Sequence, residues 1–146
     1  MFDKIVEESK IKSPWLFHLN MGSCNGCDIE FVALLTPRYD VERFGIKLTG
    51  SPRHADIVVV SGPLTSQVKD RVLKVISQVP EPKVIVSLGS CPMSGNVFKG
   101  SYSVEAPVDR FFHVDVSVAG CPPKPEAMID GILKAVEILK EKRGIK

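Results

Sequence analysis

Short apolar runs alternate with amphipathic stretches along this chain, and each pattern predicts a different kind of element. Nearly continuous apolar runs, typical of strands buried on both faces of a parallel sheet, occupy 15–20, 56–61 and 83–88. Weaker alternation of apolar and polar residues predicts two further strands at 45–49 and 112–118. The chain is therefore expected to contain five strands.

Between the strands, apolar residues recur at helical spacing. The clearest helix is predicted at 66–79, whose apolar face carries Val68, Val72, Val75, Ile76 and Val79. Another is predicted at 28–36, where Asp28 and Glu30 favour the first turn and Pro37 ends it. The last begins at Pro125 and has an apolar stripe made of Met128, Ile129, Ile132, Leu133, Val136 and Leu139.

Strands that alternate with helices indicate an α/β protein with a parallel sheet covered on both faces. Five strands fit a flavodoxin-like, doubly wound domain with a mostly parallel five-stranded sheet. The length of 146 residues is that of one domain, and we assign 13–146 to it. Residues 1–12 are predicted to form a separate capping or docking segment, because Phe2, Ile5 and Val6 share helical spacing.

Charge and hydropathy exclude some classes of partner. A net charge of +2 without a basic stripe argues against nucleic-acid binding. No apolar run is long enough to span a bilayer or to form a secretory signal, so the chain is expected in the cytoplasm without a transmembrane segment. The basic residues near the C-terminus are interpreted as a solvated helix end, favourable to the helix dipole: Lys140, Lys142, Arg143 and Lys146.

The four cysteines occupy related places in this pattern. Cys24 and Cys27 form a CxxC motif between the strand at 15–20 and the next helix, while Cys91 and Cys121 each follow another predicted strand. Carboxyl ends of parallel strands share one rim of the sheet, where ligands bind in doubly wound folds. The four cysteines are therefore expected to converge there. The long loop predicted at 89–109 adds to this rim, since such loops are usually functional.

Four thiols outside a secretory context favour metal or redox chemistry over disulfides. They can hold a [4Fe–4S] cluster or a structural zinc ion, or act as a CxxC dithiol with two other cysteines. Three separate loops suit a bulky cluster, glycines beside the cysteines allow close backbone approach, and Pro92, Pro122 and Pro123 stiffen the loops. The scattered histidines His18, His54 and His113 are interpreted as structural or surface residues.

Several motifs together resemble one family. SCNGCDIE at 23–30, PRYDVERFG at 37–45, SPRHAD at 51–56, GSC at 89–91 and GCPP at 120–123 resemble the small, cluster-bearing subunit of membrane-bound energy-converting [NiFe] hydrogenases and respiratory complex I. The resemblance extends from about residue 13 to 140. It implies a flavodoxin-like fold and one [4Fe–4S] cluster with four protein ligands, namely Cys24, Cys27, Cys91 and Cys121.

The resemblance also implies roles for residues around the cluster. Glu30, Arg53, His54 and Pro122 are expected near it, with proton coupling at Glu30 or His54 and no catalytic residue in this chain. In complex I subunits the first two cysteines are adjacent. Here Asn25-Gly26 separates them, as in hydrogenases. Further cluster-binding cysteines, which ordinary hydrogenase small subunits carry, are absent from the sequence.

By this resemblance the chain is expected to transfer electrons from ferredoxin to the large catalytic subunit of a membrane-bound energy-converting [NiFe] hydrogenase. Sulfane or polysulfide reduction and quinone reduction by related complexes are the alternatives, and a zinc-stabilised interaction module is a more distant one. The expected partners are the large subunit, a ferredoxin-like multi-cluster subunit and membrane subunits. They would hold the chain at the cytoplasmic side of the membrane.

Overall fold

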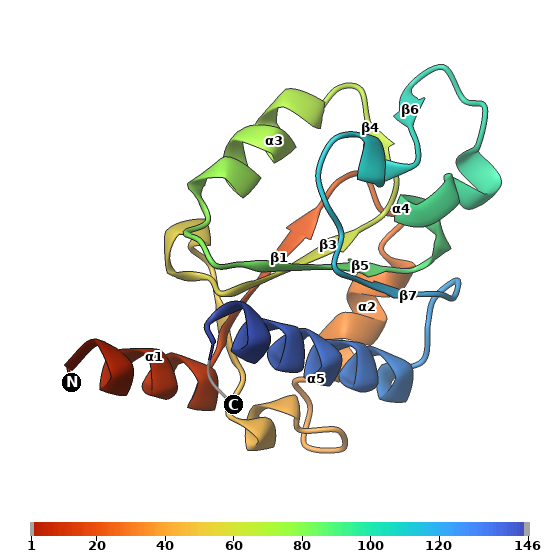
Figure 1. Ribbon diagram of the computed structural model, residues 1–146. Helices are drawn as coiled ribbons and strands as arrows, with labels where there is room; N and C mark the ends of the chain where they lie inside the picture. Colours follow the sequence, from red (N-terminus) through yellow and green to blue (C-terminus); the bar gives the residue numbers. More distant parts are fainter. Residues whose placement is uncertain (1, 145–146) are drawn as a thin grey trace.

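A computed structural model describes residues 2–144, and a five-stranded sheet forms its centre (Figure 1). The strand order is β2-β1-β3-β5-β7, and every neighbouring pair is parallel. The strands are β1 (Trp15–Asn20), β2 (Lys47–Thr49), β3 (Ile57–Ser61), β5 (Val84–Leu88) and β7 (Val116–Val118). Counted within this sheet, the order is the 2-1-3-4-5 arrangement of flavodoxin-like folds, so the predicted fold is confirmed.

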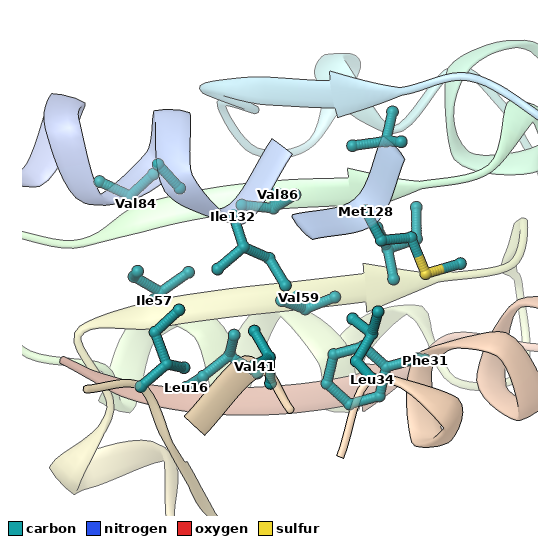
Figure 2. Packing of buried hydrophobic residues seen from close by; sticks show 14 of the residues in the cluster. Leu16, Phe31, Leu34, Val41, Ile57, Val59, Val84, Val86, Met128 and Ile132 are labelled. Carbon is teal, nitrogen blue, oxygen red and sulfur yellow. The ribbon is translucent and has the colours of Figure 1, made fainter. Parts of the chain in front are cut away.

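Helices cover both faces of the sheet (Figure 1). The main helices are α1 (Phe2–Lys12), α2 (Gly26–Ala33), α3 (Lys69–Gln78) and α5 (Pro125–Lys142). Helices α2 and α5 contribute Phe31, Met128 and Ile132 to one apolar core, which packs on Val59 and Val86 of the sheet (Figure 2). A second core on the opposite face joins Val58 and Val60 to Val72 and Ile76 of α3.

The segment predicted as a long loop contains regular structure. It begins with α4 (Ser90–Ser94), continues through a 3-10 helix at Asn96–Phe98, and reaches β6 (Val104–Glu105). Strand β6 pairs antiparallel with β4 (Leu64–Thr65) in a separate two-stranded sheet. These elements are too short for a periodic pattern, which explains why the sequence did not predict them. Short 3-10 helices also occur at Val41–Phe44, Pro52–His54 and Val108–Arg110.

Ion pairs hold the end of α5 at the amino edge of the sheet. Arg143 pairs with Asp56, which also accepts a hydrogen bond from the backbone N–H of Trp15 at 3.0 Å. Lys142 pairs with Asp115 at 2.6 Å and donates to the Lys83 carbonyl at 2.9 Å. The interpretation of this basic end as merely solvated was wrong for Lys142 and Arg143, because carboxylates distant in sequence bind them. Lys146 lies outside the described residues.

Candidate metal centre

The first two cysteines lie on a tight turn between β1 and α2. The Asn20 side-chain oxygen accepts hydrogen bonds from the backbone N–H groups of Gly22 and Ser23, both at 2.9 Å. Asn25 has a left-handed backbone with φ of 69° and immediately precedes α2. The turn leaves Cys24 exposed, while Cys27 enters the first turn of the helix and is buried.

The thiol of Cys27 interacts electrostatically with the other three cysteines. The pKa of its thiol is raised to about 11, first by burial and then by negative charge on Cys91 and Cys24. Asp28 and Cys121 act in the same direction with smaller effects. A thiolate here would thus be opposed by three other thiolates close enough to interact with it. The three loops thus place the other cysteines within electrostatic range of Cys27.

The third cysteine loop lies directly against Cys27. Gly89 has a φ of +85°, and a Cβ atom at this position would lie 2.8 Å from the Cys27 sulfur and 3.3 Å from the Gly120 carbonyl oxygen. Only glycine combines this backbone with so close an approach. Two residues later, Cys91 is buried in α4, and burial followed by the charge of Cys121 raises the pKa of its thiol.

Backbone hydrogen bonds join the Cys91 loop to the Cys121 loop. Gly89 N–H donates to the Val118 carbonyl at 2.8 Å, and Ser90 N–H donates to the Gly120 carbonyl at 2.9 Å. These bonds continue the pairing of β5 with β7 beyond the strands. Cys121 then emerges exposed, followed by an exposed Pro122.

Together the three loops form a half-open site. Two thiols are buried, two are exposed, and all four are free. Within residues 2–144, no group of three or more His, Cys, Asp or Glu side chains is arranged to bind a single metal ion. The cradle formed by Gly89 against Cys27 fits a group that needs close backbone approach and thiolate ligands from several loops.

The other expected residues divide between two edges of the sheet. Glu30 lies in α2, three residues after Cys27 and therefore on nearly the same side of the helix. Arg53 and His54 lie in the 3-10 helix before β3, and the His54 ring is 5.9 Å from that of Trp15, the first residue of β1. The structure does not bring Arg53 and His54 together with the cysteines, because their motif precedes a strand whereas each cysteine motif follows one.

A polar network beside the cysteine turn was not predicted. It connects His18 of β1 with Asp28 of α2 and Ser61 of β3. The available signal was the pair of polar residues His18 and Asn20, which alternate within an otherwise apolar strand and so share one face of the sheet. Their partners could not be inferred without the register between β1 and β3.

Comparisons with known proteins connect this arrangement to a family. Residues 24–135 match the family described as the 20 kDa subunit of NADH ubiquinone oxidoreductase. A relative from Pyrococcus furiosus, named as a probable membrane-bound hydrogenase subunit mbhJ, is 58% identical over 128 residues. The match covers 88% of this chain and 77% of that protein.

Solved structures agree with the fold. A chain in the structure of an archaeal membrane-bound sulfane sulfur reductase superposes with a TM-score of 0.82 at 36% identity, covering 96% of this chain and 77% of that one. A chain of an NAD+-reducing [NiFe]-hydrogenase gives a TM-score of 0.62 at 15% identity, covering 86% and 92%. The second likeness concerns the fold alone.

Proposed function

The chain belongs to the family of the 20 kDa subunit of NADH ubiquinone oxidoreductase, and from this premise we propose that it transfers electrons within a membrane-bound energy-converting [NiFe] hydrogenase. It is a subunit of an oxidoreductase complex. The observation that carries the proposal is that Cys24, Cys91 and Cys121 all lie close enough to Cys27 for their charge to act on its thiol.

In this proposal the four thiolates hold one [4Fe–4S] cluster, which supplies one-electron transfer when bound. Gly89 leaves room beside the Cys27 sulfur, and the hydrogen bonds from Gly89 and Ser90 keep the Cys91 and Cys121 loops together. Glu30, one turn beyond Cys27, is the residue proposed to exchange a proton as the charge of the site changes. His54, at the opposite edge of the sheet, has no part in this proposal.

The exposed side of the site is where partner subunits are proposed to bind. Cys24 and Cys121 are exposed, and Ile29 and Val32 on α2 are 68% and 59% exposed although both are apolar. The proposed partners are a large catalytic subunit, a ferredoxin-like multi-cluster subunit as electron donor, and membrane subunits. No described helix has the length and apolar character to cross a bilayer. Because relatives of this chain are named as parts of membrane-bound complexes, peripheral attachment through partners at the cytoplasmic side is part of the proposal.

Two acceptors are supported by different relatives. The Pyrococcus furiosus relative carries a hydrogenase name at 58% identity, which favours proton reduction. The sulfane sulfur reductase chain superposes at a TM-score of 0.82, which supports sulfur reduction as the second candidate. The two acceptors are distinguished by supplying the intact complex with reduced ferredoxin and measuring the products. Hydrogen evolution without sulfide supports the first acceptor, and sulfide from polysulfide without hydrogen supports the second.

The electron-transfer role is tested by changing a buried cysteine. Cys91→Ser removes one ligand, so at least half of the iron and acid-labile sulfide is expected to be lost, together with the low-temperature EPR signal of the reduced protein. Metal analysis and EPR of the purified complex measure this. Met93→Ser is the matched control, because Met93 is an exposed sulfur-containing side chain of the same short helix. Zinc in place of iron would instead support the zinc-stabilised interaction module.

A further inference from the structure

The Asp28 carboxylate, directly after Cys27, is held by three side chains from two strands. Ser61 of β3 donates its hydroxyl proton to Oδ1 at 2.6 Å. Asn20 of β1 donates from its side-chain nitrogen to Oδ2 at 2.6 Å. His18 Nε2 lies 3.0 Å from Oδ1. The Asp28 side chain is only 16% exposed, so these contacts replace most of its water.

The protonation of this group follows from its contacts. The Ser61 hydroxyl uses its one hydrogen atom in the hydrogen bond to Asp28. Its oxygen is therefore free to accept a hydrogen bond from His18 Nε2, which lies 3.1 Å away. His18 Nε2 therefore carries a proton that faces two acceptors. Stacking on Phe31 at 4.7 Å between ring centroids fixes the imidazole plane. Burial lowers the pKa of His18 despite the opposing charge of Asp28, so the ring is neutral at pH 8.

Ser, His and Asp side chains in contact invite comparison with a hydrolytic triad, but this geometry is different. One histidine nitrogen contacts both partners, the serine hydroxyl donates to the aspartate, and Ser61 is fully buried. A nucleophilic serine needs the histidine between itself and the carboxylate, and access to substrate. The contacts of His18 and Ser61 therefore fix the Asp28 carboxylate in place and do not form a nucleophilic site.

This carboxylate is connected to the cysteine turn at both ends. Asn20 holds Asp28 through its amide nitrogen and holds the N–H groups of Gly22 and Ser23 through its oxygen. Asp28 follows Cys27 in α2, and its charge is one of the causes that raise the pKa of the Cys27 thiol. A single set of polar contacts thus fixes the turn before Cys24 and a negative charge after Cys27.

We propose that Asn20, His18 and Ser61 are positioning residues that hold the Cys24–Cys27 turn and partly neutralise Asp28, and thereby set the reduction potential of the group bound by the cysteines. This inference rests on the proposed function. Reduction adds negative charge to the site, so an ionised Asp28 opposes it and the hydrogen bonds to Asp28 reduce that opposition. Removing the charge and removing its donors therefore shift the potential in opposite directions.

The test measures the midpoint potential of the assembled complex by EPR-monitored redox titration at pH 8. Asp28→Asn is expected to favour reduction about tenfold, an increase of about 59 mV for a one-electron couple. Ser61→Ala leaves the carboxylate less neutralised, and is expected to disfavour reduction two- to threefold, a decrease of about 20–30 mV. Asn20→Ala is expected to lower the potential too and to broaden the EPR signal, because the turn loses its acceptor.

Ser87→Ala is the matched control. Ser87 is 1% exposed on the neighbouring strand β5, and its hydroxyl donates to that of Ser117 at 3.0 Å, away from Asp28. Its variant is expected to keep the wild-type potential. Asn20 is exposed, so Asn20→Ala supplies the same sign test if Ser61→Ala fails to assemble.

The outcomes separate this inference from the function on which it rests. A wild-type complex without a reduced-cluster EPR signal overturns both. A wild-type signal, with Asp28→Asn and the donor variants shifted in the same direction or not shifted, overturns the positioning role alone. Loss of iron in the variants at an unchanged potential does so as well, because it indicates a purely structural contact.

Discussion

At the scale of single residues, Cys27 combines burial with the charge of its neighbours. In the metal-free chain its pKa of about 11, against an ordinary 9.0, leaves roughly a hundredfold smaller thiolate fraction at pH 8. Alkylation by iodoacetamide is therefore expected to be at least tenfold slower at Cys27 than at the exposed Cys24, and to accelerate as the pH rises toward 11. Peptide mass spectrometry of timed samples measures both rates.

The same reaction in urea is the control for the Cys27 prediction. Unfolding removes the burial and separates the four thiols, so the two rates should converge. Equal rates in the folded chain at pH 8 would show that Cys27 is neither shielded nor opposed by the other thiols.

Residues near the cysteines were predictable to different degrees. The convergence of Cys91 and Cys121 followed from their places after strands, because parallel strands share a carboxyl edge. The partners of Asp28 were not predictable, since Ser61 lies 33 positions away and reaches it only through the register of β1 with β3. The expectation for Arg53 and His54 rested on the resemblance and not on the strand pattern, which puts their motif before a strand and so at the edge opposite the cysteine loops.

At the scale of elements, the glycine before Cys91 decides how closely β5 approaches α2. Gly89→Ala is expected to reduce the iron content of the purified complex by at least half, because the new Cβ would lie 2.8 Å from the Cys27 sulfur. Gly100→Ala is the control for a substitution at a positive φ without a contact, since Gly100 has a φ of +85° and no atom within 4 Å of an added Cβ. Gly89 also has a ψ of 171°, which together with a positive φ is a backbone region open essentially to glycine alone, so Gly89→Ala adds backbone strain to the contact with Cys27.

Iron analysis and thermal unfolding of the two glycine variants give the comparison. Equal losses in Gly89→Ala and Gly100→Ala would mean that backbone strain, and not the approach to Cys27, determines the effect.

Elements were predictable where their pattern was long. The helix Lys69–Gln78 lies within its predicted range because its apolar period extends over several turns, and the strands Ile57–Ser61 and Val84–Leu88 do so because each is a continuous apolar run. The last strand, expected over 112–118, is confined to Val116–Val118. Phe112 instead packs into the core beside α3, so its apolar character marked burial and not a strand.

At the scale of the whole molecule, the cysteine loops and the ion pairs that hold the end of α5 lie at opposite edges of the sheet. The cysteine loops lie at its carboxyl edge, whereas the ion pairs of Asp56 with Arg143 and Asp115 with Lys142 lie at its amino edge. A five-residue parallel strand such as β3 separates these edges by about 16 Å. Stability and metal chemistry should therefore respond to different substitutions.

Asp56→Asn tests this separation. The Asp56 and Arg143 side chains are only 12% and 4% exposed, and breaking such a buried pair is expected to cost about 3–5 kcal/mol of unfolding free energy. Urea denaturation measures the loss, while the EPR signal of the loaded protein should keep its shape. Asp70→Asn, at an exposed position of α3, is expected to change stability by less than about 0.5 kcal/mol. Equal stability of the two variants would contradict an anchoring role for Asp56.

The parallel order of the strands has a consequence for biosynthesis. The thiols come from loops after β1, β5 and β7, and the β7 loop with Cys121 is made only shortly before α5. A nascent chain that has emerged from the ribosome only as far as α4 carries three of the cysteines but lacks the strand that brings the fourth to them. The complete set of four thiols is therefore available only after synthesis of the chain is nearly finished, and a premature stop before β7 leaves a chain without Cys121.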